Sequence, residues 1–365
     1  MRSSAAAATI LCLSLTANGC GGVRPPAAPP VFPLKPVWTT PVGDFIEGSL
    51  ATDGRRLFAI TRAGVVRALE PATGEILWQS DQRTGALAAG EAGLVVRLVD
   101  GTVKSLAPAK GTLRWETASG IVGDLPPVLD GDRVLIAGKG LAALDLATGR
   151  VLWSAPTDPT ITSPPIPAGS RLVAGEEDGT LRCRDRASGV SLWTLRTRSA
   201  LLAAPVFDAE RGRLYVGTTD RRILEVGLEK GHRGWTWKVG ADIDSPGVIQ
   251  EHRVLFAAFD AVLYALNRGN GNLVWRAPLP SRPISGPLVS GRTVLVACHE
   301  SDVIGFDLKT GKAVGNLRTS ARIGTAPLLL GGRLFLGLLD RTVVGFELAS
   351  FGTDPTRESR QALRY

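Results

Sequence analysis

Apolar residues in this chain form short runs that alternate with polar positions, and turn residues separate the runs. Residues 121–155 show the unit well. Pro126-Pro127-Val128 begins one run, 133–137 and 141–145 form the next two around a Gly-Lys-Gly turn, and Val151-Leu152-Trp153 follows Thr148-Gly149. Runs of this length with turn signals between them are typical of β-strands. With 43 Gly and 24 Pro and no long helical pattern between them, the chain is predicted to be all-β.

This unit recurs about every 40 residues. The turn glycines lie 37 to 42 residues apart, at Gly74, Gly111, Gly149, Gly189, Gly231, Gly271 and Gly311. A tryptophan occupies one slot of the repeat at Trp38, Trp78, Trp115, Trp153, Trp193, Trp235 and Trp275. The slot after Gly311 holds Gly315 instead, and Trp237 adjoins a slot. A period near 40 residues with four short strands is the signature of a β-propeller.

Each part of the repeat has an expected role. The glycine supplies the positive φ of a tight turn, and the Asp or Asn before it caps the turn amides. The tryptophan is expected to pack between neighbouring blades and to bury about 150–250 Å².

The two ends of the repeat array are incomplete in complementary ways. Trp38 has no strands before it, and the copy that opens at Gly345 has no outer strand after Phe351. One blade built from both ends of the array would close the ring and remove its exposed edges. The sequence therefore predicts an eight-bladed propeller over residues 37–351, with seven whole blades and one split blade. Residues 352–365 are polar and charged, and we expect a loose tail there.

Composition limits the class of protein. The chain has 365 residues, of which 44% are hydrophobic and 21% charged, so a disordered chain is excluded. No apolar run after residue 20 is long enough for a membrane span. The formal charge of +8 is spread along the chain and would suit acidic partners or anionic lipid, or it serves solubility. No basic run with interleaved aromatics indicates nucleic-acid binding.

The N-terminus has the layout of a secretory signal. Arg2 precedes a small and apolar stretch, Ala5 to Leu15, and residues 1–19 end before Cys20. A cysteine at this point resembles the bacterial lipoprotein signal, which implies that Cys20 is lipidated, although Ala17 stands where Leu is usual. Cleavage without lipidation is the alternative. Gly21 after the cysteine implies outer-membrane sorting in that class. The proline-rich residues 20–36 are then expected to form an extended tether.

The repeat resembles a known superfamily. The pattern A-x-D-x-x-T-G-x-x-x-W, seen best from Ala143 to Trp153, is similar to that of the quinoprotein-type (PQQ-like) eight-bladed propellers. Within the superfamily, signal, cysteine, tether, single propeller and size resemble the BamB family of outer-membrane assembly lipoproteins. The resemblance implies a non-enzymatic, lipid-anchored scaffold that faces the periplasm and needs no cofactor. It would dock on the periplasmic domains of the barrel insertase BamA and help nascent outer-membrane proteins reach it.

The resemblance also suggests docking residues. Asp242-Ile243-Asp244 before Ser245-Pro246 matches the family's acidic pair in a loop leading into a blade. A partner loop one blade earlier carries apolar and Arg residues in the family. The residues nearest to it here are Leu195, Arg196 and Arg198, which do not align cleanly. The alternatives are a turn cap for the acidic pair and a solvated strand end for the arginines.

Two other functions stay open. The chain could be a PQQ-like propeller lipoprotein that binds another envelope protein or a peptide, or a divergent quinoprotein dehydrogenase. Against the enzyme, the sequence has no adjacent cysteines, Ca²⁺-loop spacing or phosphate loop. His232, His252 and His299 lie far apart, and the last belongs to a His-Glu-Ser-Asp stretch at a turn position. Cys183 and Cys298 are expected to be buried thiols, and a disulfide between them is the alternative.

Overall fold

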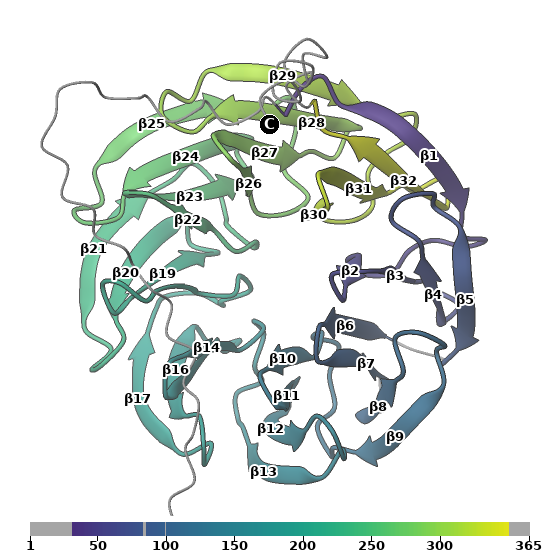
Figure 1. Ribbon diagram of the computed structural model, residues 1–365. Coiled ribbons are helices and arrows are strands. Elements are labelled where there is room, and N and C mark those ends of the chain that lie inside the picture. Colours follow the sequence, from purple (N-terminus) through teal and green to yellow (C-terminus); the bar gives the residue numbers. More distant parts are fainter. Residues whose placement is uncertain (1–30, 83–84, 99, 350–365) are drawn as a thin grey trace, which may run out of the picture.

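The computed structural model describes residues 31–82, 85–98 and 100–349, and the regular secondary structure of these ranges is β-strand throughout. The strands form eight four-stranded antiparallel sheets arranged around a central axis (Figure 1). The first strand of each blade lies nearest the centre and the fourth lies at the rim. The predicted all-β, eight-bladed propeller is therefore confirmed.

The blades follow one another in chain order. Blade 1 consists of β2 (Ala51–Thr52), β3 (Leu57–Ile60), β4 (Val65–Leu69) and β5 (Ile76–Asp81), and blade 2 of β6 (Ala86–Gly90), β7 (Gly93–Arg97), β8 (Thr102–Leu106) and β9 (Leu113–Ala118). Blade 3 consists of β10 (Val128–Asp130), β11 (Arg133–Gly138), β12 (Gly140–Asp145) and β13 (Val151–Pro156), and blade 4 of β14 (Ile166–Ala168), β15 (Arg171–Gly175), β16 (Thr180–Asp185) and β17 (Ser191–Arg196). Blade 5 consists of β18 (Val206–Asp208), β19 (Arg213–Thr218), β20 (Arg222–Gly227) and β21 (Arg233–Lys238), and blade 6 of β22 (Val248–Gln250), β23 (Arg253–Ala258), β24 (Val262–Asn267) and β25 (Leu273–Pro278). Blade 7 consists of β26 (Leu288–Ser290), β27 (Thr293–Ala297), β28 (Asp302–Asp307) and β29 (Ala313–Arg318), and blade 8 of β30 (Leu328–Leu330), β31 (Arg333–Gly337), β32 (Thr342–Glu347) and β1 (Lys35–Pro41).

Burial follows the position of a strand in its blade. In blade 3, β11 and β12 are almost wholly buried, because neighbouring blades cover both faces of these central strands. The outer strand β13 alternates between exposed and half-buried residues. The strands of blade 3 lie at the runs predicted for residues 121–155. The exception is β10, which starts at Val128 because the two preceding prolines have no N–H to donate.

Blade 8 closes the ring. Its sheet order is β1-β32-β31-β30, and β1 pairs with β32 in an antiparallel register from Lys35 opposite Glu347 to Pro41 opposite Thr342. In Figure 1 the purple β1 lies along the outer edge of the yellow strands. This pairing gives β32 a partner on both sides and confirms the predicted split blade.

Each repeat tryptophan packs on the turn glycine of the next blade. A Cβ atom added at Gly149 would lie 2.5 Å from the ring of Trp115, and the other six glycines face Trp38, Trp78, Trp153, Trp193, Trp235 and Trp275 in the same way. Glycine is therefore required twice, for its positive φ and for the close approach of the ring. Six indole N–H groups also donate to a carbonyl of the next blade, as Trp115 does to Leu146 at 2.9 Å. Trp153 Nε1 is buried without a partner among the described residues.

The seventh blade, which lacks a tryptophan, uses a different residue. Phe32 fills the space over Gly305 and Gly315, where an added Cβ would come within 2.2 Å of its ring. Val31 and Leu34 are buried in the same cluster between blades 7 and 8. The prediction that residues 20–36 form a tether is thus wrong for 31–36. The apolar side chains of this stretch pack over the position of blade 7 where the repeat has Gly315 in place of a tryptophan. Residues 1–19, Cys20 and 352–365 lie outside the described residues.

The connections between strands define two faces of the ring. Because all strand pairs are antiparallel, the turns between first and second and between third and fourth strands share one face, here called the turn face. The turns between second and third strands and the connections between blades form the opposite loop face. No helix long and apolar enough to cross a membrane occurs in the described part of the chain.

Candidate partner-docking site

The acidic pair lies in the connection between β21 and β22, on the loop face. Asp242 and Asp244 are half-exposed, and Ile243 between them is fully buried against Gly217 and Phe256. The Ile243 N–H donates to Thr218 O at 3.2 Å, and the Asp242 carbonyl accepts from an amide of the next blade at 3.0 Å. The buried isoleucine and these backbone bonds hold the two carboxylates at the surface on either side of one fixed point.

The two carboxylates have different surroundings. Asp242 makes no side-chain hydrogen bond or ion pair with another described residue. Asp244 Oδ1 accepts a hydrogen bond from the hydroxyl of the neighbouring Ser245 at 2.9 Å, which is a side-chain contact and not a cap of a turn amide. Asp244 also lines a central cavity of about 500 Å³ together with the segments 245–248 and 284–288. Asp242 is therefore the carboxylate more available to a partner.

The predicted arginines and leucine lie one blade earlier. Leu195 is half-buried on β17 and packs against the core between blades 4 and 5. The Arg196 side chain is 82% exposed and lies 3.7 Å from Asp178. Arg198 is exposed in the connection 197–205. Both arginines are thus exposed, Arg196 in an ion pair with Asp178 and Arg198 without a side-chain partner among the described residues, while Leu195 contributes to the core.

A single turn links the two connections. Thr219 Oγ1 in the β19–β20 turn donates to Ala200 O at 3.0 Å, and Thr218 of the same turn receives the Ile243 amide. The structure therefore brings the connection of Arg198 and the connection of the acidic pair against the same turn of blade 5.

The sequence analysis did not identify several charged residues that the fold places beside the acidic pair. Asp220 and Arg222 form an ion pair at 3.4 Å in the linking turn. Asp260, in the next turn along, accepts hydrogen bonds from Tyr264 Oη at 2.5 Å and from Gly240 N at 2.9 Å. Burial of the phenol and its bond to Asp260 raise the pKa of Tyr264 to about 12. The recurring position of these turns in the repeat is the signal that could have located them.

The whole loop face is acidic. Its described connections carry fourteen acidic residues, namely Asp44, Glu47, Asp100, Asp124, Asp158, Glu176, Glu177, Asp178, Asp220, Asp242, Asp244, Asp260, Glu300 and Asp340. They carry seven basic residues, namely Arg62, Lys139, Arg198, Arg221, Arg282, Arg322 and Arg341. This excess of negative charge favours a basic partner surface.

The histidines and cysteines occupy the positions that the sequence indicated. His232, His252 and His299 are exposed in turns of three different blades, and His299 begins the turn that leads into β28. Cys183 and Cys298 are buried and unbonded. Burial raises the pKa of both thiols, that of Cys298 to about 12. Within the described ranges, no group of three or more His, Cys, Asp or Glu could hold a metal ion.

Comparison with known proteins assigns the family. The family model described as "Outer membrane protein assembly factor BamB" matches residues 35–98, 99–258 and 185–335. This chain belongs to the BamB family. The BamB of Yersinia pestis is 22% identical over 328 residues, which are 84% of this chain and 76% of that protein. The BamB of Burkholderia pseudomallei is 24% identical over 335 residues, 85% of this chain and 76% of that protein.

Solved structures agree on the fold. The crystal structure of BamB from Moraxella catarrhalis has a TM-score of 0.72 at 16% identity and covers 86% of this chain and 100% of that chain. A quinohemoprotein alcohol dehydrogenase from Comamonas testosteroni has a TM-score of 0.70 at 13% identity, covering 88% and 77%. The tetrathionate hydrolase of Acidithiobacillus ferrooxidans is 29% identical over 166 residues, 40% of this chain and 33% of that protein. The fold is thus shared by BamB proteins and by enzymes.

The central cavity of this BamB-family propeller is a poor match for the cofactor of quinoprotein dehydrogenases. That cofactor, PQQ, is a tricarboxylate and needs cationic or multiple N–H partners. The cavity lining consists of small, apolar and serine residues, and its single ionisable side chain is the carboxylate of Asp244. A tricarboxylate placed there would meet like charge and no cation.

Proposed function

We propose that this chain is a non-enzymatic scaffold lipoprotein of the outer-membrane β-barrel assembly machinery. Cys20 would carry the lipid, and the propeller would face the periplasm from the outer membrane. Its loop face would dock on the periplasmic domains of the insertase BamA and aid delivery of outer-membrane proteins. Membership of the BamB family carries the proposal, and relatives named as outer membrane protein assembly factors support it.

The charge of the loop face supports the choice of docking surface. The half-exposed Asp242 has no partner among the described residues, and the buried Ile243 holds it in a fixed position. Because the backbone at Asp242 is already held in place, a cation that binds the carboxylate has only the side chain left to order. Acidic residues on neighbouring turns would also steer a basic partner surface towards it.

A pull-down from solubilised envelope tests the proposal. The C-terminally tagged protein should recover BamA, and Asp242→Arg combined with Asp244→Arg should lower that recovery at least tenfold, because like charges would then face each other. The matched control is Asp124→Arg with Asp158→Arg. These exposed loop-face residues undergo the same charge change two to three blades away, and recovery should stay within twofold of the parent.

Three outcomes would contradict the proposal in different ways. Recovery of BamA that is equal for both double variants would remove the docking site but keep the function. Recovery of other envelope proteins without BamA would favour a propeller that serves another complex. Dye reduction by the purified protein that depends on added PQQ would overturn the non-enzymatic assignment. Circular dichroism of each variant shows whether the fold is intact.

A further inference from the structure

Both ends of the described chain meet on the turn face at blade 8. The Ala349 N–H donates to Val31 O at 3.1 Å, and the Leu348 N–H donates to Gly332 O, in the β30–β31 turn, at 3.2 Å. Cys20 precedes Val31 by 11 residues, a length of chain that spans at most about 38 Å. A lipid at Cys20 would therefore hold the ring close to a membrane, attached at its turn face.

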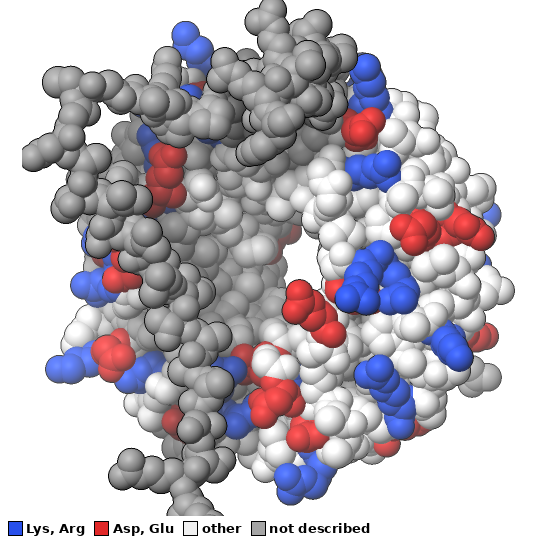
Figure 2. Space-filling model, viewed as in Figure 1, with Lys and Arg blue, Asp and Glu red and all other residues white. Residues whose placement is uncertain are grey.

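The turn face is basic, in contrast to the loop face. Its described turns carry eleven basic residues, namely Arg55, Arg56, Lys110, Arg150, Arg186, Arg211, Lys230, Arg268, Arg292, Lys309 and Lys312. They carry eight acidic residues, namely Asp53, Glu70, Glu75, Glu91, Asp132, Glu210, Glu229 and Glu251. Figure 2 shows charged residues of both signs over the described part of one face. The difference in net charge between the two faces comes from the residues of their turns and connections.

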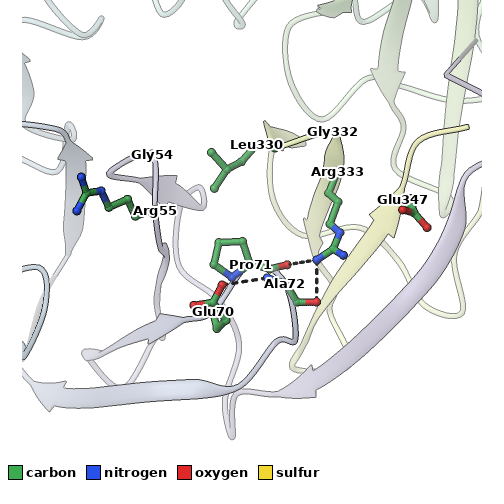
Figure 3. Close-up of a pocket in the computed structure, with 10 residues that line it drawn as sticks. Gly54, Arg55, Glu70, Pro71, Ala72, Leu330, Gly332, Arg333 and Glu347 are labelled. Carbon is green, nitrogen blue, oxygen red and sulfur yellow. Dashed lines mark hydrogen bonds between the residues drawn. The ribbon is translucent and has the colours of Figure 1, made fainter. Parts of the chain in front are cut away.

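Two arginines of this face are free to bind an anion. Arg55 and Arg114 are exposed and line a cleft of about 640 Å³ between blades 1 and 2, and neither guanidinium bonds to another described residue. Arg56 in the same cleft is already paired with Asp53 at 3.0 Å. In the adjoining cleft, Figure 3 shows Arg333 occupied by backbone carbonyls of the 71–72 turn, at 2.9 and 2.7 Å, whereas Arg55 is drawn without such a bond.

Exposed apolar side chains gather along the same side of the ring. Of the thirteen large hydrophobic residues exposed in the described chain, ten lie at or just before the start of an outer strand. They are Val37, Ile76, Leu77, Leu113, Val151, Val190, Leu192, Leu273, Val274 and Val314. Outer strands start at the turn face, so these residues form an apolar rim around the basic surface. The other three of these thirteen described residues, Val122, Leu202 and Leu339, lie on the loop face.

We propose that the turn face lies on an anionic phospholipid bilayer. Arg55 and Arg114 would bind headgroup phosphates, and the apolar rim would enter the interfacial region, which is the combination found in interfacial membrane binding. The affinity need not be high, because a short tether raises the effective concentration of the face at the membrane. The acidic loop face then points away from the bilayer.

Vesicle flotation of the chain from Gly21 onward tests this directly, since that chain keeps all eight blades and lacks any lipid. It should float with vesicles of phosphatidylglycerol and phosphatidylethanolamine but not with phosphatidylcholine, and the floated fraction should fall as salt rises. Arg55→Glu with Arg114→Glu should weaken binding at least tenfold. The matched control, Arg198→Glu with Arg221→Glu on the loop face, should change it less than twofold.

A second pair of variants tests the rim. Leu113→Asp with Val190→Asp should weaken binding, whereas Leu202→Asp with Leu339→Asp on the loop face should not. Absence of flotation with the anionic vesicles, or equal losses from both faces, would overturn the proposal. Binding of an acidic polypeptide such as polyglutamate with no vesicle binding would assign the face to a protein partner instead. None of these measurements involves BamA, so they can fail while the proposed function stands.

Discussion

A repeat tryptophan stabilises a blade to which it does not belong. Its ring covers the turn glycine of the next blade, and its indole N–H usually donates a hydrogen bond to one of that blade's backbone carbonyls. Trp153 has the ring contact without the hydrogen bond. The seven interfaces that use tryptophan are thus alike in packing and unlike in polar bonding, which allows the two contributions to be measured separately.

Replacing tryptophan by phenylalanine at two of these positions isolates the hydrogen bond. Trp115→Phe removes the bond to Leu146 O and should cost about 1 kcal/mol more than Trp153→Phe, which removes a donor that had no partner. Urea unfolding of the two variants and the parent gives the difference. Equal losses would show that the indole N–H adds nothing to stability and that ring packing alone joins the blades.

At the scale of the element, the recurring unit is the turn between the third and fourth strands. In blade 3, Asp145 Oδ1 accepts bonds from both the hydroxyl and the amide of Thr148. In blade 4, Asp185 does the same with Ser188. These hydrogen bonds hold the pKa of each carboxyl below its ordinary value. The turns are therefore acid-sensitive components of the ring.

The sign of this effect predicts a pH dependence. A carboxyl whose pKa is lowered by folding stabilises the folded state above its unfolded pKa of about 3.9, and the stabilisation is lost as the pH falls through the folded pKa. Asp145→Asn with Asp185→Asn should lower the urea midpoint at pH 6, and the gap to the parent should narrow as the pH falls below the unfolded pKa of about 3.9. A gap that is constant across this range would mean that the charge of the two side chains is immaterial.

At the scale of the whole molecule, the ring is closed by contacts that span nearly the entire chain. β1 completes the sheet of β32, and Trp38 on β1 docks on Gly74 of blade 1. On the other side of blade 8, Phe32 covers Gly315 of blade 7. The N-terminal segment thus joins blade 8 to both of its neighbours.

A double-mutant cycle between Phe32 and Gly315 tests this closure. Gly315→Ala should destabilise the parent by about 1–3 kcal/mol, because the added methyl meets the phenyl ring. In a Phe32→Ala background the same change should cost no more than about 0.5 kcal/mol, which is the usual error of additivity. Urea unfolding of the four proteins measures the coupling. If the losses of the two single variants simply add in the double variant, Phe32 does not pack against Gly315.

The sequence allowed the fold to be predicted because its information is local and repeated. A turn glycine and a tryptophan in every copy define the blade, and the incomplete end copies define the closure. The position of Phe32 could not be predicted, since the glycines it covers lie more than 270 residues away and their missing side chains leave no pattern. For the site, the spacing of Asp242 and Asp244 located the connection. The central cavity beside Asp244 and the opposite charges of the two faces require knowing which turns share a side.

The split blade also fixes the order in which the ring can be completed. β1 is among the first strands to be synthesised, and its partner β32 is the last, so Lys35 must wait for Glu347, 312 residues later. At roughly 5–20 residues per second, synthesis of this stretch alone takes on the order of 15–60 s. A chain that is cut short, even by one blade, has no strand with which to pair its beginning. The ring can therefore close only in a chain that extends through β32.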